Sequence, residues 1–172
     1  MSSGILSSEP QSANSGCIII SAFIAAGKSY LAKHATDLNY NVIDLDSSLV
    51  PKEERLRPNG FKESYTALVE KSIAPNTIIL LSTHEEIRSA LVEQGRNYAL
   101  VYPNKDSKDE WIERLHCRKS PESLINNVQA NWLSMLDECE NQGGCVHFTV
   151  KEGTYLSDMI GDIIRYTVAI DG

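Results

Sequence analysis

An apolar strand, a glycine-lysine-serine loop and a helix follow one another near the start of this chain and constrain its fold most. The apolar run 17–20 leads into the loop 21–29, which ends in Gly27, Lys28 and Ser29. A loop of this kind between a strand and a helix is typical of sites that bind the phosphates of a nucleotide. We therefore expect a sheet whose first strand delivers this loop to a ligand site.

Each residue of the loop end has a chemical part in this interpretation. Gly27 lets the backbone approach phosphate oxygens, Lys28 reaches the β- and γ-phosphates, and Ser29 offers its hydroxyl to Mg²⁺. The N-terminal N–H groups of the next helix point at the same phosphates. The alternative is a strand-to-helix turn in which Lys28 is only solvated. The residues expected to bind the nucleotide are Ala22, Phe23, Ala25, Ala26, Gly27, Lys28, Ser29 and Tyr30.

One residue of the loop departs from the usual pattern. That pattern has glycine, four further residues and then Gly-Lys-Ser or Gly-Lys-Thr, and Ala22 stands where the first glycine belongs. If this position needs a positive φ, alanine costs about 1 kcal/mol there. The other interpretation is that the loop holds Ala22 in an ordinary backbone conformation.

Length and composition fit one globular domain behind a short tail. The 172 residues are 42% hydrophobic and 23% charged, and no apolar run approaches the ~20 residues of a membrane helix. The net charge of −7 disfavours a general nucleic-acid-binding surface, although a local basic patch stays open. Residues 1–16 are rich in serine and lack the features of a signal peptide. We therefore expect a flexible tail over 1–16, a domain over 17–172 and a cytoplasmic location.

Apolar runs alternate with amphipathic segments along the whole domain. This alternation predicts parallel strands joined by right-handed crossovers, and strands that are apolar on both faces predict helices on each side of the sheet. The fold class is therefore α/β, a three-layer sandwich. The expected strands are 17–21, 41–45, 77–82, 98–102 and 145–150, and the expected helices are 28–38, 61–73, 85–94, 106–118, 121–140 and 155–169.

The second expected strand ends in two aspartates, Asp44 and Asp46. Ligands of a parallel sheet bind beyond the carboxyl ends of its strands, and side chains two residues apart on an extended segment point the same way. Asp44 is the expected metal residue, holding a Mg²⁺-bound water. Asp46 is the expected catalytic and acceptor-binding residue, because it can orient an attacking hydroxyl or accept its proton. The alternative is that either aspartate only caps the next turn.

The third expected strand ends with hydroxyl groups in place of a carboxylate. Thr83 and Glu86 have the spacing of a helix capping box. Ser82 and His84 can still reach a metal-bound water or the acceptor, so His84 is a candidate for binding the acceptor. The other interpretation of this histidine is a structural one.

Basic residues follow the fourth strand, in a segment that we expect to form a lid around 103–120. Arg114 and Arg118 are spaced i, i+4 and share a helix face. Two arginines on a mobile lid can clamp the transferring phosphoryl group, so both are expected catalytic residues. The alternative is a solvated face that pairs with neighbouring acidic side chains.

A polar loop before the helix 61–73 is where an acceptor could be held. Arg55 suits an acceptor that already carries phosphate, and Phe61 and Tyr65 suit a base that stacks. The alternative is a solvated loop above an aromatic pair that faces the core.

With these elements in place, the chain resembles the small phosphate-loop kinases of the P-loop NTPase superfamily, which include nucleoside, nucleotide, shikimate and gluconate kinases. The resemblance rests on Gly27-Lys28-Ser29 after a strand, on Asp44-x-Asp46 and on the basic lid residues 105–119, and it covers roughly residues 16–170. It implies a five-stranded parallel sheet in the order 2-3-1-4-5, ATP with Mg²⁺, and an acceptor-orienting role for Asp46. The chain is most similar to phage and bacterial kinase-like proteins in the segments 43–48, 82–84, 101–103 and 155–158.

The sequence thus predicts an ATP-dependent phosphotransferase that acts on a small acceptor, with a nucleoside or nucleotide as one candidate. One alternative is a kinase that acts on a base or sugar within a nucleic acid, which the net charge disfavours. Another is a nucleotide-binding module without catalysis, which is favoured by Ala22 and by the missing carboxylate at the end of the third strand. A slow ATPase without an acceptor is the third. The expected partners are ATP and a small molecule, without a membrane.

Overall fold

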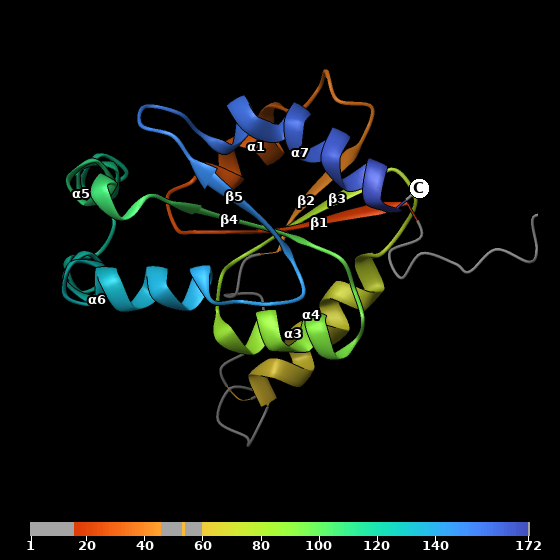
Figure 1. Ribbon diagram of the computed structural model, residues 1–172, viewed down its shortest axis with the longest axis horizontal. Helices are drawn as coiled ribbons and strands as arrows, with labels where there is room; N and C mark the ends of the chain where they lie inside the picture. Colours follow the sequence, from red (N-terminus) through yellow and green to blue (C-terminus); the bar gives the residue numbers. More distant parts are fainter. Residues whose placement is uncertain (1–15, 46–52, 54–59, 172) are drawn as a thin grey trace, which may run out of the picture.

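Five parallel strands form one sheet at the centre of the protein (Figure 1). The computed structural model describes residues 16–45, 53 and 60–171. The strand order is β2-β3-β1-β4-β5, so the order that the family resemblance implied is confirmed. The strands are β1 (Cys17–Ala22), β2 (Asn41–Asp44), β3 (Thr77–Leu81), β4 (Ala99–Pro103) and β5 (Val146–Val150).

Helices cover both faces of this sheet, which confirms the three-layer α/β sandwich (Figure 1). One face carries α1 (Lys28–His34) and α7 (Leu156–Asp171). The opposite face carries α3 (Gly60–Ser72) and α4 (Glu85–Glu93). None of the helices within the described ranges is both long enough and apolar enough to cross a membrane.

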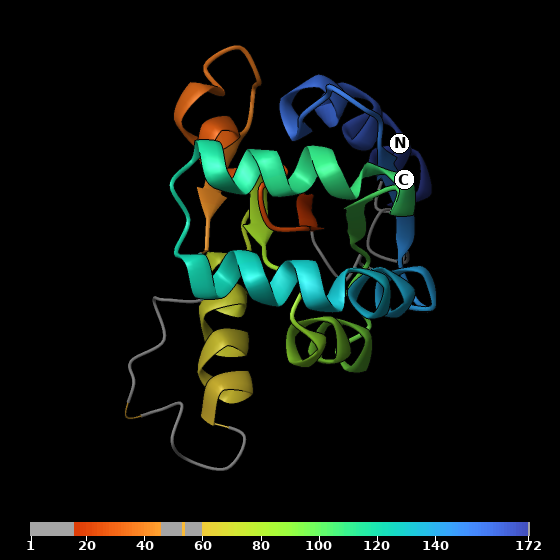
Figure 2. The same cartoon turned by 90° about the vertical axis from the view of Figure 1, so that its left-hand side faces the viewer.

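Two further helices extend past the carboxyl ends of the strands. After the 3₁₀ turn η3 (Lys105–Ser107), α5 (Lys108–Cys117) and α6 (Glu122–Glu140) run side by side at this end of the sheet (Figure 2). Arg88 of α4 forms an ion pair with Glu138 of α6 at 3.6 Å. The site at the strand ends is therefore walled on one side by α5 and α6.

The three central strands explain the continuous apolar runs of the sequence. Every residue of β1, β3 and β4 is buried, because helices pack on both of their faces. Isoleucines are paired between neighbouring strands: Ile79 of β3 lies beside Ile19 of β1 and beside Ile43 of β2. The edge strands β2 and β5 are only partly buried, as expected where one side of a strand has no neighbour.

The elements differ from the expectation at a few ends. Helix α1 stops at His34 instead of residue 38, and the expected helix 106–118 is divided between η3 and α5. The expected capping box of Thr83 and Glu86 is wrong: His84 is the residue before α4, and no side chain caps that helix. Spacing alone misplaced the cap by one residue.

Ile79 tests the central strands as the source of stability. Replacing it by alanine in Ile79→Ala deletes a fully buried side chain, so we expect the free energy of unfolding to fall by about 2–5 kcal/mol. Leu133→Ala is the control, because Leu133 is an exposed side chain of α6, and we expect a change within about 0.5 kcal/mol. Urea unfolding measures both, and equal losses would contradict this core.

Candidate functional site

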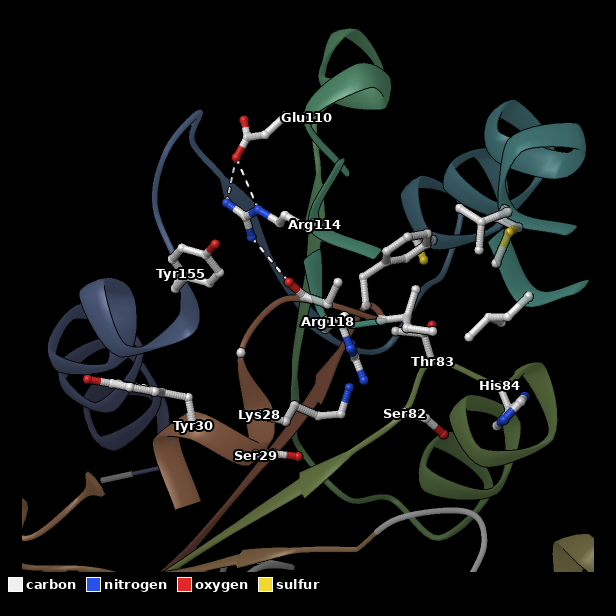
Figure 3. Close-up of a pocket in the computed structure, with 18 of the residues that line it drawn as sticks. Lys28, Ser29, Tyr30, Ser82, Thr83, His84, Glu110, Arg114, Arg118 and Tyr155 are labelled. Atoms are coloured by element: carbon white, nitrogen blue, oxygen red, sulfur yellow. Dashed lines mark hydrogen bonds and ion pairs between the residues drawn. The ribbon is translucent and has the colours of Figure 1, made fainter. Parts of the chain in front are cut away.

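A cavity of about 1160 Å³ lies beyond the carboxyl ends of the strands (Figure 3). Its walls come from the loop after β1, from the ends of β2 and β3, from α5 and α6, and from the loop before α7. These segments are far apart in the sequence, and the parallel sheet brings them to one edge. The cavity therefore lies where ligands of such sheets bind.

Hydrogen bonds hold the loop after β1 along its whole length. Each backbone carbonyl of residues 22–27 accepts a hydrogen bond. The donors are Lys28 Nζ to Ala22 (3.0 Å), Ala26 N to Phe23 (3.1 Å), Trp111 Nε1 to Ile24 (2.8 Å), Arg114 Nη1 to Ala25 (3.2 Å), Leu156 N to Ala26 (2.8 Å) and Leu31 N to Gly27 (3.0 Å). Because a trans peptide directs its N–H opposite to its C=O, these bonds also fix the directions of the loop's N–H groups.

The backbone angles of the loop settle the question raised by Ala22. Among non-glycine residues in the described ranges, positive φ occurs at Ala25, Asn76 and Lys119, so Ala22 has an ordinary conformation. The left-handed positions of the loop are Ala25, with φ 65°, and Gly27, with φ 105°. A Cβ on Gly27 would lie in ordinary contact with the Tyr155 ring, at 3.4 Å, so the positive φ is what requires glycine there.

Helix α5 anchors the loop through two buried side chains. Trp111 is fully buried, and its indole N–H donates to Ile24. The Arg114 guanidinium donates to Ala25, to Glu110 and to the carbonyl of Thr154. It lies 3.9 Å from the Trp111 ring centroid and 4.0 Å from that of Tyr155. Figure 3 shows its pairing with Glu110 and its place beside Tyr155. This arrangement ties the loop after β1 to the loop before α7. Arg114 lines the cavity, yet its donors serve the protein backbone and Glu110.

One end of the cavity combines cations with a hydroxyl-carboxylate pair. Lys28 and Arg118 both line the cavity, and their charged ends point toward one another (Figure 3). The Ser29 hydroxyl donates to Asp44 Oδ2 at 3.0 Å, across the gap between α1 and β2. Hydroxyl and carboxylate oxygens are hard donors of the kind that Mg²⁺ takes, so this pair fits a metal bound together with phosphate.

The end of β3 brings Ser82, Thr83 and His84 to the cavity wall. The Ser82 hydroxyl oxygen is buried and has no hydrogen-bond partner among the described residues. The His84 ring meets the Phe61 ring edge to face, with centroids 5.6 Å apart. His84 therefore lies at the cavity as expected, and Phe61 packs behind it.

The remaining candidates from the sequence separate into three groups. Tyr30 lines the cavity, is 58% exposed and stacks on His34. Tyr65 is buried, and its hydroxyl donates to the Leu45 carbonyl, so its contacts are with the protein interior. Asp46 and Arg55 lie outside the described residues.

Sequence reasoning missed several cavity residues. Tyr155 belongs to the clamp around Arg114, and the apolar side chains of α6 form a wall. Glu110 was considered only as an acidic partner on a solvated face, and it pairs with the buried Arg114. No spacing in the sequence marked these residues as cavity residues, because contacts between distant segments bring them there. The α6 side chains that line the cavity are Leu124, Asn127, Val128, Met135, Glu138 and Cys139.

Comparison with solved structures identifies the fold. A gluconokinase from Sinorhizobium meliloti 1021 matches with a TM-score of 0.57 and 15% identity, over 91% of this chain and 93% of that chain. The tunicamycin resistance protein of Deinococcus radiodurans matches with a TM-score of 0.58 and 14% identity, over 88% and 94%. No protein-family model matches the sequence, and the search of curated proteins gives no relative. At these identities the likeness establishes the P-loop kinase fold alone.

The clamp predicts that Arg114 cannot be replaced even by the other long cation. Arg114→Lys keeps the charge but loses the planar fork that serves three acceptors, so we expect unfolding free energy to fall by about 1–3 kcal/mol. Arg165→Lys is the matched control, because that side chain is 77% exposed. Thermal unfolding followed by circular dichroism compares them. Unchanged stability of Arg114→Lys would contradict an anchoring role.

Proposed function

We propose that this protein is an ATP-dependent phosphotransferase that moves the γ-phosphoryl group of ATP to a small acceptor. One observation carries the proposal: Lys28, Arg118 and the Ser29–Asp44 pair converge on a single cavity at the strand ends. The P-loop kinase fold supports it, since that fold is shared with a gluconokinase. If the loop were only a strand-to-helix turn with a solvated Lys28, these groups would have no reason to meet at one cavity.

The residues around Ser29 fit ATP with Mg²⁺. Mg²⁺ in such sites takes one or two protein oxygens and fills its other positions with phosphate and water. Ser29 and Asp44 would hold it. When bound there, it neutralises charge on the β- and γ-phosphates.

The chain's own contribution is positioning and electrostatic stabilisation. The anchored loop fixes the backbone before any ligand arrives, so little ordering is needed on binding. Lys28 releases the Ala22 carbonyl to meet phosphate oxygens, and Arg118 approaches the same charge from α5. Two cations placed where charge develops in the transition state supply most of the rate enhancement in phosphoryl transfer of this kind. We assign the orientation of the acceptor hydroxyl to Asp46.

Lys28 gives the direct test of phosphoryl transfer. In Lys28→Ala we expect ADP release with a panel of acceptors to fall about a hundredfold or more, because one preorganised charge is lost. Lys33→Ala on the exposed side of α1 is the matched control and should leave the rate unchanged. Calorimetry with ATP and circular dichroism accompany the assay. Retained turnover in a folded Lys28→Ala protein would contradict the assignment.

Asp46 distinguishes a kinase from a module that only binds nucleotide. In Asp46→Asn we expect acceptor-dependent transfer to fall by roughly 10²–10⁴, the usual contribution of a positioned base, while ATP affinity stays the same. Steady-state kinetics with varied acceptor and calorimetry with ATP separate the two quantities. An unchanged rate would remove Asp46 from the reaction. ATP binding without acceptor-dependent turnover in the unsubstituted protein would favour the binding module.

A further inference from the structure

The cavity has two ends with different chemistry. Every lysine and arginine among its described lining residues lies at the phosphate loop, on α5 or directly after α5: these are Lys28, Arg114 and Arg118. The other end lies between the end of β3 and helix α6 (Figure 3). If the cationic end takes the phosphates of ATP, as the proposed function requires, the α6 end is the space left for the acceptor.

Apolar side chains dominate the wall at the α6 end. Phe23 and Val128 are nearly or fully buried, and Met135 and Leu124 are half-buried beside them. Burial raises the pKa of the Cys139 thiol to about 11, so this side chain is neutral at physiological pH and behaves as a small apolar group. An apolar ligand surface covered by this wall gains about 25 cal/mol for each Å² removed from water.

The charges at this end are negative. Glu85 and Glu138 line it. The buried cation Arg88 is 3% exposed and already pairs with Glu138 at 3.6 Å, and it donates to the Thr83 carbonyl at 2.9 Å and to the Gln142 side chain at 2.6 Å. An anionic acceptor would meet carboxylates and apolar surface here without a lysine or arginine among the described residues at that end to pair with it.

One polar group at this end calls for a ligand partner. The buried Ser82 hydroxyl has no hydrogen-bond partner among the described residues, although such groups are almost always paired. Ser82 lines the cavity between the phosphate loop and the α6 wall. A hydroxyl on an acceptor bound beside the end of β3 is the partner that this group lacks.

We propose that the acceptor is an uncharged or cationic alcohol with an apolar body, which packs against α6 and directs its hydroxyl toward Ser82 and the phosphate loop. This proposal rests on the proposed function and names its acceptor class. In the transfer, the acceptor oxygen bonds to the γ-phosphorus and the bond from that phosphorus to the bridging oxygen breaks. ADP leaves, and the hydroxyl proton passes to solvent water.

Three alcohols that share one apolar body and differ in charge test this acceptor class. They are phenylpropanediol, which is neutral, phenylalaninol, which is cationic, and phenyllactate, which is anionic. Calorimetry with the full chain and a non-hydrolysable ATP analogue measures their affinities. We expect the neutral and cationic alcohols to bind at least about tenfold more tightly than phenyllactate, a ratio equivalent to 1.4 kcal/mol.

Two lysine substitutions on the same helix locate the binding. Met135→Lys puts a positive charge into the wall and should remove or reverse the preference against phenyllactate. Leu133→Lys adds the same charge to an exposed position of α6 that does not line the cavity, and it should leave the preference intact. Tighter binding of phenyllactate to the unsubstituted chain, binding of none of the three, or equal effects of the two lysines would overturn the proposal.

Failure of the acceptor class and failure of the proposed function give different results. If ADP release is stimulated only by anionic acceptors such as sugar acids or phosphorylated sugars, the transferase stands and the acceptor class is wrong. If the neutral alcohol binds with the expected response to Met135→Lys but receives no phosphate, the pocket assignment stands and the transferase is wrong. The binding assay thus decides the pocket without depending on turnover.

Discussion

Two hydrogen bonds from α5 hold the loop on which the rest of this site depends. The Trp111 indole N–H donates to the carbonyl of Ile24, and the Arg114 guanidinium donates to the carbonyl of Ala25. These are consecutive residues of the loop after β1. The two hydrogen bonds secure a segment in which Ala25 has a positive φ, a conformation that costs alanine about 1–3 kcal/mol and persists only where the surrounding contacts enforce it. The loop is thereby shaped by α5 before any ligand binds.

This anchoring gives the two arginines of the basic segment after β4 different roles. From the sequence alone, Arg114 and Arg118 were expected to act together as one cationic pair on a helix face. In the structure they have different surroundings, because Arg114 is 8% exposed and bonded to backbone carbonyls, whereas Arg118 points with Lys28 into the cavity. The buried Trp111 makes α5 part of the scaffold, so closure over a ligand would have to involve residues beyond that anchor.

Much of the fold follows from the sequence, because its signals are local. The runs that form β1, β3 and β4 are apolar on both faces, and only a covered parallel sheet buries them fully. The loop end at Gly27, Lys28 and Ser29 is equally recognisable in the sequence, and Ser29 and Asp44 were both expected at the metal, although their direct hydrogen bond was not predicted. Other parts were not: the positive φ at Ala25, the clamp of Arg114 and the α6 wall all depend on tertiary contacts between distant segments, which no spacing in the sequence encodes.

The central claim is that the anchored loop binds the phosphates of ATP, and amide NMR during a titration with Mg²⁺ and ATP tests it most directly. We predict large shifts of the Ala25, Gly27 and Lys28 amides, while the Trp111 indole N–H keeps its position because it stays bonded to Ile24. Unchanged loop amides at saturating ATP, or shifts confined to residues away from the cavity, would contradict the claim.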